Sequence, residues 1–371
     1  MTRGISGHLG ALFVGLSLAF GAYVNCDQMG RVRSFESQGN QSENPPPGGP
    51  SSQQPPALPP IDDSKLDSVN QVTRGPYLQV STPHSIVIRW RTNHLTRGKI
   101  RLGPDPDRMV YEFEEPQPTR EHEVIARGLR EATRYYYSIG SEFGRLAGHD
   151  QQHYFVTHPK VGTEKSTRIW VLGDSGTKDA NARAVRDAYH SKTGNKHTDL
   201  WLMLGDNAYT DGTDAEYQAA VFNMYPHMLR TSALFPTRGN HERDDSPYYQ
   251  IFTMPTKGEA GGLPSGSEAY YSFDYANIHF VCLDSTGSSR SPTGAMAKWL
   301  KDDLANNSAL WTIAYWHHPP YSKGSHDSDT EGALVEMREH FLPILEDNGV
   351  DLVMAGHSHS YERSVLLDGH Y

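Results

Sequence analysis

Alternating apolar and polar side chains mark the first patterned part of the chain. In "SIVIRWRT", Ile86, Ile88 and Trp90 point to one face and the intervening residues to the other, and "TRYYYSIG" repeats the alternation. This period of two predicts strands. The turn-forming stretches "GPDPD" and "PQP" separate them. Short strands joined by such turns predict a small antiparallel, all-β sandwich over residues 71–160.

The pattern changes at about residue 165, where apolar strands begin to alternate with helical segments. "RIWVLGD" precedes "DANARAVRDAYHS", "DLWLMLGDN" precedes "DAEYQAAVFNMYPHMLR", and "LWTIAYWHH" precedes "GALVEMREHFLPILEDN". Strand and helix in this order predict buried parallel strands with helices over their faces. "SEAYYSFDYANIHFVCLD" instead indicates an antiparallel hairpin. The predicted fold class is therefore α/β, an α+β sandwich with mixed, largely parallel sheets, over residues 165–371.

The first 70 residues have neither pattern. "MTRGISGHLGALFVGLSLAFGAYVNC" has one arginine, an uncharged apolar stretch and the small pair Ala19 and Gly21, which is typical of an export signal over residues 1–21. An uncleaved anchor is the alternative, although the apolar stretch is short for a membrane span. Residues 22–70 are rich in Pro, Ser, Gln and Gly, and this composition predicts a disordered linker. The sequence thus predicts an exported protein, secreted, periplasmic or at the cell surface, with no membrane span in its mature form.

Charge and cysteine content narrow the class further. The chain has 34 Lys plus Arg against 44 Asp plus Glu, a formal charge of -10, and no basic stripe. This balance predicts no nucleic-acid partner. Cys26 and Cys282 are the two cysteines, and Cys282 lies within the apolar run "IHFVCLD". Cys282 is predicted to be a buried small hydrophobe, and no disulfide framework is expected.

Side chains of the kinds that bind metals follow the apolar strands at five places. The stretches are "VLGDSG", "MLGDNAY", "TRGNHE", "AYWHHPP" and "MAGHSH", and they supply Asp174, Asp206, Tyr209, Asn240, His241, His317 or His318, His357 and His359. Ligands collect at the carboxyl ends of strands in open α/β sheets. A carboxylate or imidazole buried there loses solvation, which a bound cation would offset. Glycine precedes four of these groups and allows tight turns into a crevice.

The ligand types favour a particular kind of metal centre. Carboxylate, phenol, amide and imidazole without thiolate exclude an iron–sulfur cluster and a zinc finger, and they suit iron, manganese or zinc. The groups are too many for one tetrahedral ion, whereas two ions about 3.5–4 Å apart are a recurring device for phosphoryl hydrolysis. Taken singly, Asp174 could be a helix N-cap, Asn240 a turn residue and Tyr209 a packed aromatic. A solvated helix face is expected for Glu331, Glu336, Glu339 and Glu346.

In order and spacing, GDSG, GDNAY, GNHE, the His317 stretch and GHSH resemble the five sequence blocks of the purple acid phosphatases, within the binuclear metallophosphoesterases. The resemblance implies two metal ions, ferric iron and a divalent ion (Zn, Mn or Fe), with Asp206 as their shared ligand. The implied ligands are Asp174, Asp206, Tyr209 and His359 for the ferric ion, and Asp206, Asn240, His317 and His357 for the divalent ion. His317 is preferred to His318 because it aligns with the family block.

The same resemblance implies a reaction. It predicts hydrolysis of small phosphate monoesters, with a metal-bridged hydroxide as the nucleophile. His241 would contact the phosphate or protonate the leaving oxygen, and His326, nine residues after His317, resembles a second such histidine. Two alternatives stay open: a phosphodiesterase or nucleotide hydrolase with the same site, and a non-catalytic surface binding protein that holds metal.

Two further expectations come from the resemblance. The stretches "RGPYLQ", "SIVIRWRT" and "LREATRYYYSIG" resemble the fibronectin type III-like domain that precedes the catalytic domain in purple acid phosphatases. Relatives usually continue with further strands beyond a point equivalent to "LLDGHY". The catalytic domain is therefore expected to be truncated at its carboxyl end.

Overall fold

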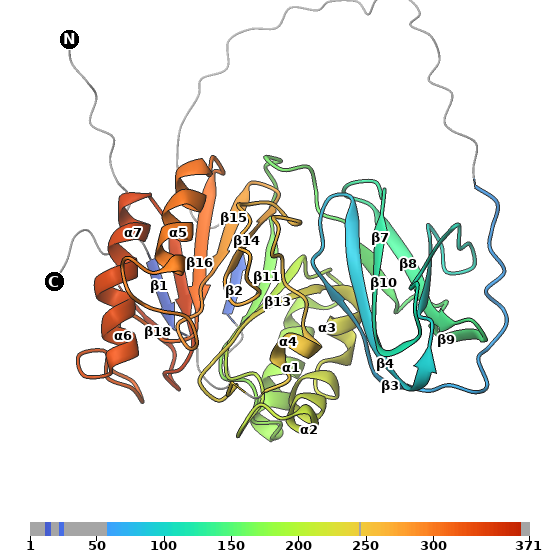
Figure 1. Ribbon diagram of the computed structural model, residues 1–371, viewed down its shortest axis with the longest axis horizontal. Helices are drawn as coiled ribbons and strands as arrows, with labels where there is room; N and C mark the ends of the chain where they lie inside the picture. Colours follow the sequence, from blue (N-terminus) through green and yellow to red (C-terminus); the bar gives the residue numbers. More distant parts are fainter. Residues whose placement is uncertain (1–11, 16–21, 26–57, 245, 365–371) are drawn as a thin grey trace, which may run out of the picture.

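The structure of the protein, a computed structural model, describes residues 12–15, 22–25, 58–244 and 246–364. A β-sandwich and an α/β unit lie next to each other in it (Figure 1). Most of the predicted export signal and linker lie outside the described residues. The predicted boundaries of the domains therefore stay predictions.

The first unit consists of antiparallel strands in two sheets. One sheet has the order β3-β4-β7, and the other has the order β10-β8-β5-β6 with β9 also paired to β8. The strands are β3 (Val72–Gln79), β4 (Ser85–Thr96), β5 (Lys99–Gly103), β6 (Tyr111–Glu114), β7 (Thr119–Arg127), β8 (Arg134–Ser141), β9 (Gly144–Gly148) and β10 (Tyr154–Val156). Ile86, Ile88 and Trp90 are fully buried, as their alternation predicts. The all-β fold class is confirmed, whereas the fibronectin type III-like assignment stays a prediction.

The second unit has two mixed sheets. Their orders are β13-β12-β11-β2 and β14-β15-β16-β17-β1-β18. The strands are β11 (Arg168–Leu172), β12 (Leu200–Leu204), β13 (Ala233–Thr237), β14 (Tyr271–Tyr275), β15 (Ile278–Cys282), β16 (Trp311–Trp316), β17 (Leu352–Ala355) and β18 (Glu362–Arg363). The series β11, β12, β13 and the series β15, β16, β17 are parallel, and β14 and β15 form the predicted hairpin. The predicted mixed, largely parallel fold is confirmed.

Helices flank the two sheets. They are α1 (Ala180–Thr193), α2 (Asp214–Tyr217), the π-helical turn η2 (Gln218–Phe222), α3 (Pro226–Thr231), α4 (Tyr248–Ile251), α5 (Ala295–Asn306), α6 (Gly332–Glu336), the π-helical turn η3 (Met337–Phe341) and α7 (Leu342–Asp347). Helices α5, α6 and α7 lie beside the β15–β17 sheet, and α1 and α3 lie with the other sheet (Figure 1). The rings of Phe235 on β13 and Phe273 on β14 stack 3.9 Å apart between the sheets. Continuous apolar strands are thus covered on both faces.

Local sequence signals define the ends of α1. The side chain of Asp179 accepts a hydrogen bond from the Ala182 backbone N–H at 2.9 Å, which satisfies one free donor of the first turn. Gly194 ends the helix at φ +57°, a conformation that costs glycine little. Ala182, Val185 and Tyr189, spaced three or four residues apart, are buried. The Tyr189 ring stacks 4.3 Å from Trp170 on β11, which fixes this helix against the strand that leads to Asp174.

Two amino-terminal strands extend the sheets of the α/β unit. β1 (Leu12–Gly15) pairs in parallel with β17, and β2 (Ala22–Asn25) pairs antiparallel with β11. β1 lies within the segment predicted as an export signal. Without β1 and β2, the strands β17 and β11 would each have one unpaired edge. The backbones of β1 and β2 satisfy the hydrogen-bonding groups along those edges.

The sandwich contacts the α/β unit through two arginines, of which Arg74 is buried and Arg91 partly exposed. The Arg74 guanidinium lies 2.8 Å from an Asp214 carboxylate oxygen, and Arg91 lies 2.9 Å from the other oxygen. Asp214 begins α2, where Glu216 and Thr213 form a reciprocal capping box. The Glu216 carboxylate also accepts the Thr210 backbone N–H at 2.5 Å. The sandwich therefore holds the segment that directly follows Tyr209.

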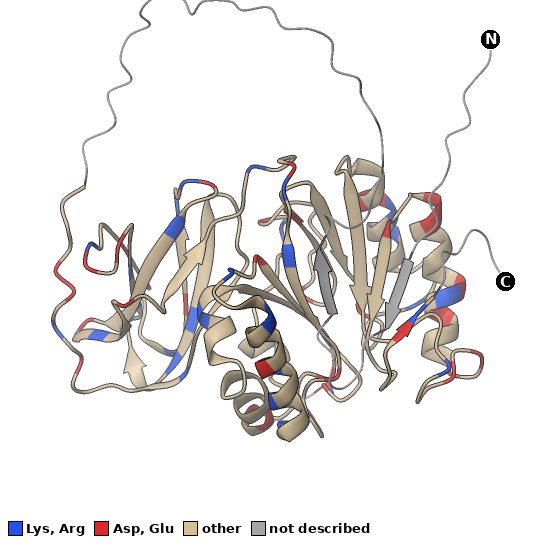
Figure 2. Ribbon diagram, turned by 180° about the vertical axis from the view of Figure 1, so that it is seen from behind, with Lys and Arg blue, Asp and Glu red and all other residues tan. Residues whose placement is uncertain are grey.

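Charged residues of both signs are spread over both units (Figure 2). Cys282 is fully buried on β15 and has a free thiol, which confirms its prediction as a buried residue. In the part of the chain that the structure describes, no helix combines the length and apolar character needed to cross a bilayer.

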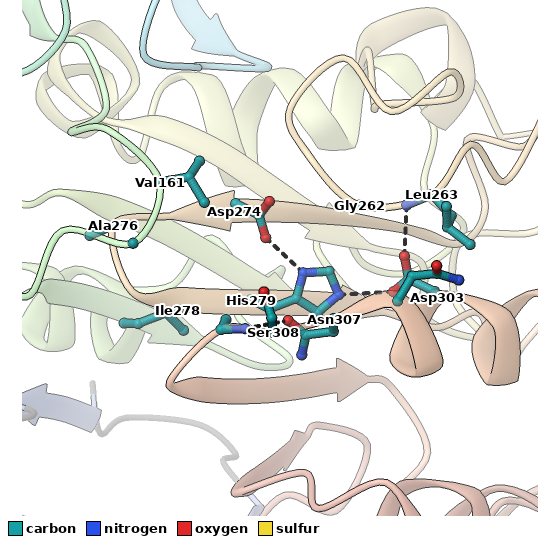
Figure 3. Close-up of a pocket in the computed structure, with 13 residues that line it drawn as sticks. Val161, Gly262, Leu263, Asp274, Ala276, Ile278, His279, Asp303, Asn307 and Ser308 are labelled. Carbon is teal, nitrogen blue, oxygen red and sulfur yellow. Dashed lines mark hydrogen bonds and ion pairs between the residues drawn. The ribbon is translucent and has the colours of Figure 1, made fainter.

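A buried ion triad of His279, Asp274 and Asp303 lies at the amino-terminal end of β15. It borders a cavity of about 370 Å³ between the start of β15, the 262–263 loop and the end of α5 (Figure 3). His279 Nδ1 donates to Asp274 at 2.7 Å, and Nε2 donates to Asp303 at 2.9 Å. Burial opposes protonation, but the two carboxylates prevail and raise the pKa of His279 to about 9.

Because of this triad, the folded protein should lose stability at alkaline pH. The pKa of His279, about 9 in the folded protein, lies above its ordinary value of 6.5. Its contribution, about 3 kcal/mol, is fully present below pH 6.5 and is lost as pH rises through 9. The free energy of unfolding can be measured in urea at about pH 6 and at about pH 10. We expect it to fall between these two pH values by about 3 kcal/mol more in the parent than in His279→Gln.

His158 provides a matched control. It is buried and contacts the Asp274 carbonyl at 3.2 Å, and burial lowers its pKa to about 3. In the folded protein it therefore stays neutral over the whole interval, and His158→Gln should alter the parent's pH dependence by less than about 1 kcal/mol, through protonation of the unfolded chain alone. An equal change with pH in the parent and in His279→Gln would show that the triad does not carry the effect.

Candidate metal centre

The predicted ligands converge because they follow the carboxyl ends of five neighbouring strands. These strands are β11, β12, β13, β16 and β17, and they lead to Asp174, Asp206, Asn240, His317 and His357 respectively. Tyr209 and His359 follow within a few residues on the loops after β12 and β17. The residues come from both sheets, so the site lies where the two sheets meet.

The backbone at this point is unusual. Asp174, Asp206 and His357 have φ values of +53°, +50° and +68°, in the left-handed region that non-glycine residues rarely adopt. Such conformations cost of order 1–3 kcal/mol each and tend to occur at functional sites. Gly205 precedes Asp206 at φ +90°, and a β-carbon there would lie 2.6 Å from His317 Nδ1. Glycine at this position therefore lets β12 and β16 bring their ligands close together.

A first cluster gathers around the Tyr209 hydroxyl. It lies 3.3 Å from Asp174 Oδ1, 3.3 Å from Asp206 Oδ2 and 3.1 Å from His359 Nε2. His359 Nε2 is also 3.5 Å from Asp174 Oδ1. One phenol oxygen, two carboxylate oxygens and one imidazole nitrogen thus face a common point. Tyr209 is not simply a packed aromatic, and Asp179, not Asp174, caps α1.

A second cluster gathers around His317. Its Nε2 lies 2.9 Å from Asn240 Oδ1, 3.2 Å from His357 Nδ1 and 3.5 Å from Asp206 Oδ1. Its Nδ1 donates to the Leu204 carbonyl at 2.9 Å, which leaves the Nε2 lone pair for the site. Asp206 therefore contributes one oxygen to each cluster.

His318 does not share this arrangement. Its Nδ1 lies 2.9 Å from Ser285 Oγ, and its ring centroid is 4.9 Å from that of His317. Burial, reinforced by the neighbouring imidazoles, lowers the pKa of His318 well below its ordinary value. The geometry favours His317 as the residue that faces Asn240 and Asp206, while His318 packs behind it.

The electrostatics of the clusters suit cations. Burial raises the pKa of Asp174, although a hydrogen bond from His359 opposes the shift. Burial and the charges of Asp174 and Asp206 raise the pKa of Tyr209 far above its ordinary value. Two buried carboxylates beside a phenol repel one another as they ionise, and a cation between them would reverse that cost. The donor set therefore fits metal ions.

The two predicted acid–base histidines border different clusters, His241 beside Tyr209 and His326 beside His357. His241 Nδ1 donates to the Thr210 carbonyl at 2.7 Å, and its Nε2 lies 3.9 Å from Asp206 Oδ2. The ring of His326 lies 3.7 Å from the ring of His357. Both side chains are about one-third exposed. A ligand arriving from solvent could thus meet both histidines.

Two residues that sequence reasoning missed support the site from outside the clusters. The buried Glu242 carboxylate accepts backbone N–H groups of Asp206, Asn207, Ala208 and Gly239 at 2.5–3.1 Å. Glu331 contacts His326 and His357. The Glu331 side chain is 36% exposed, so it is partly solvated as expected, but at the start of α6 it contacts these two histidines and does not stand free on the helix face. Two sequence signals could have pointed to these residues. Glu242 directly follows "GNH", and Glu331 lies five residues after His326.

Comparisons with known proteins agree with this site. Residues 167–361 match the family model described as calcineurin-like phosphoesterase. Purple acid phosphatase 15 of Arabidopsis thaliana is 30% identical over 278 residues, covering 66% of this chain and 49% of that protein. Purple acid phosphatase 1 of Ipomoea batatas is 32% identical over 259 residues, covering 66% of this chain and 51% of that protein. The chain spans about half the length of these two curated relatives.

A solved structure supports the fold. The structure of PhoD aligns with a TM-score of 0.56 at 15% identity, over 76% of this chain and 70% of that chain. The resemblance to purple acid phosphatases is confirmed by the relatives. The match covers more than half of the chain, including all nine predicted site residues. The chain therefore belongs to the calcineurin-like phosphoesterase family.

Proposed function

We propose that this chain hydrolyses phosphate monoesters with two metal ions. The observation that carries the proposal is the placement of Asp206, whose two carboxylate oxygens face two separate groups of donor atoms. Asp174, Tyr209 and His359 complete the first group, which suits ferric iron because phenolate and carboxylate are hard ligands. Asn240, His317 and His357 complete the second, which suits zinc, manganese or ferrous iron. When bound, such ions neutralise phosphate oxygens and lower the pKa of water.

The protein's own residues would then orient the ester and manage the proton. The Nδ1–H of His241 donates to the Thr210 carbonyl, so its Nε2 is the nitrogen that faces the site. In the protonated form, Nε2 can donate to the phosphate or to the departing alcohol oxygen. The ring of His326 lies against that of His357. Because the implied partner is a small phosphate ester, we expect both histidines to contact it.

The test compares a monoester and a diester with the same leaving group. The full chain, loaded with iron plus zinc or manganese, should hydrolyse an aryl phosphate monoester faster than the corresponding diester. Faster hydrolysis of the diester would favour the phosphodiesterase or nucleotide-hydrolase alternative. Metal binding without turnover of either ester would favour the non-catalytic binding protein and reject the proposal.

We also propose that the protein is exported. The uncharged apolar stretch before residue 25 and the polar, proline-rich residues that follow it support this proposal. The amino terminus of protein recovered outside expressing cells should then begin after residue 21. Recovery of the chain only inside the cells, with Met1 retained, would contradict export.

A further inference from the structure

Glu331 is the residue that precedes α6, and its side chain makes no capping hydrogen bond to that helix. Its carboxylate instead lies between two histidines of the candidate site. His326 Nδ1 is 2.9 Å from both carboxylate oxygens, and His357 Nε2 is 3.2 Å from Oε2. The Asp327 backbone N–H donates to Oε1 at 3.0 Å and holds the carboxylate in place. One side chain therefore contacts a proposed metal ligand and a proposed acid–base residue together.

The contact with His357 decides which of its nitrogens can bind metal. Nδ1 of His357 faces His317 Nε2 at 3.2 Å, inside the second cluster, while Nε2 faces Glu331. A neutral imidazole carries its proton on one nitrogen and a lone pair on the other. A carboxylate can only accept, so Glu331 favours the proton on Nε2 and leaves the Nδ1 lone pair in the cluster. Carboxylates in this position commonly orient metal-binding histidines and raise their basicity.

The contact with His326 works in the same way on a second ring. Glu331 accepts from Nδ1 of His326, so the opposite nitrogen, Nε2, is left for a ligand. The rings of His326 and His357 lie 3.7 Å apart with an angle of 33° between their planes. Movement of the carboxylate would therefore release both rings together.

We propose that Glu331 is a positioning residue that fixes the orientation and tautomer of His357 and His326 at once. Metal binding at the second cluster and protonation of the leaving alcohol would thereby depend on one carboxylate. This inference rests on the proposed function for its catalytic half, whereas its metal-binding half depends only on the contacts of His357.

The first test measures metal binding and needs no turnover. Glu331→Gln keeps the size of the side chain but places an amide NH₂ against one imidazole N–H. Titration of the full chain with zinc in competition with a chelator should show the affinity for one zinc ion, the one assigned to the second cluster, reduced by about 10–100-fold. Glu339→Gln, an exposed residue on the adjoining η3, should bind zinc as the parent does.

The second test uses the leaving group. An alkyl phosphate needs protonation of its departing oxygen, whereas an aryl phosphate with an acidic phenol hardly needs it. Compared at saturating metal, Glu331→Gln should lower kcat for the alkyl ester at least about tenfold more than for the aryl ester. In a His326→Ala background, Glu331→Gln should leave this ratio unchanged, because the residue through which Glu331 acts has gone.

The outcomes separate this inference from the proposed function. Parent-like zinc affinity together with a parent-like ester ratio in Glu331→Gln would overturn the inference. Weaker zinc binding with an unchanged ratio would overturn the coupling to His326.

His326, Glu331 and His357 could together hold a cation themselves. An additional equivalent of zinc that Glu331→Gln loses would make Glu331 a ligand and overturn its positioning role. A metal-loaded parent that hydrolyses neither ester would reject the proposed function, and the zinc titration would still decide whether Glu331 orients His357.

Discussion

Replacing Asp206 with asparagine should abolish hydrolysis of an aryl phosphate monoester, with kcat/KM falling by at least about 10³-fold. Asp206 supplies one oxygen to the cluster around Tyr209 and the other to the cluster around His317. Asparagine keeps one oxygen but removes the negative charge and turns the second position into a hydrogen-bond donor. Both proposed metal positions lose a charged ligand in a single change, so the loss should exceed that from replacing any ligand of only one cluster.

The backbone makes asparagine a better choice here than alanine. Asp206 has φ +50°, a conformation that asparagine adopts several-fold more readily than most residues. Asp206 Oδ1 also accepts the His241 backbone N–H at 2.9 Å, and the asparagine oxygen can keep that bond. Asp206→Asn should therefore fold, whereas alanine would add strain and an unpaired N–H that confuse the interpretation.

Metal content and rate must be measured on the same samples. Circular dichroism should show a folded Asp206→Asn protein, and elemental analysis should show less than the parent's two ions per chain. Asp187→Asn, which changes a mostly exposed carboxylate on α1, should match the parent in both rate and metal content. A folded Asp206→Asn protein that retains two ions and activity within about tenfold of the parent would exclude Asp206 as a bridging ligand.

The general position of the candidate site was readable from the sequence because it depends on strand ends. An apolar run that stops at "GD", "GN" or "GH" can be recognised from a few neighbouring residues. Parallel strands bring such ends to one edge of a sheet. The prediction that His357 and His359 belong to different clusters came from the resemblance, and the distances around His317 and Tyr209 agree with it. The sequence did not indicate that Asp174 and His357 themselves adopt positive φ, because this depends on how the loops pack.

Residues that act across long separations were not readable. Glu331 follows a polar loop and precedes a helix, and no periodic pattern distinguishes it from a solvated glutamate. It reaches His357 because the loop before it contacts the residues that follow β17. Arg74 occupies a polar position in a β-strand, yet it is buried against Asp214, 140 residues later. Such contacts follow from how the sandwich docks, which depends on both surfaces at once and not on either sequence pattern alone.

Replacing Glu242 should have the largest effect on stability. Its buried carboxylate is the common acceptor for four backbone N–H groups on the loops after β12 and β13. Glutamine keeps one acceptor oxygen. Its NH₂ group replaces the other oxygen, and because NH₂ is a donor it leaves the backbone N–H groups on that side without an acceptor. Unpaired buried donors cost about 1–3 kcal/mol each, so Glu242→Gln should lower the free energy of unfolding by about 3 kcal/mol or more. Urea unfolding of the zinc-loaded full chain at about pH 8, above the pKa of about 7 that burial gives Glu242, measures this loss.

The same change should weaken the metal centre, because the four N–H groups fix the loops that carry Asp206 and Asn240. Burial, with the Asp206 charge adding to it, raises the pKa of Glu242 to about 7. A cation bound by Asp206 would oppose that repulsion and favour the ionised form, so metal and Glu242 should stabilise each other. Adding zinc should therefore raise the unfolding free energy of the parent more than that of Glu242→Gln. Glu339→Gln, an exposed substitution, should follow the parent within about 0.5 kcal/mol in both conditions. An equal gain from zinc in Glu242→Gln and in the parent would show that the carboxylate supports the loops without supporting the metal site.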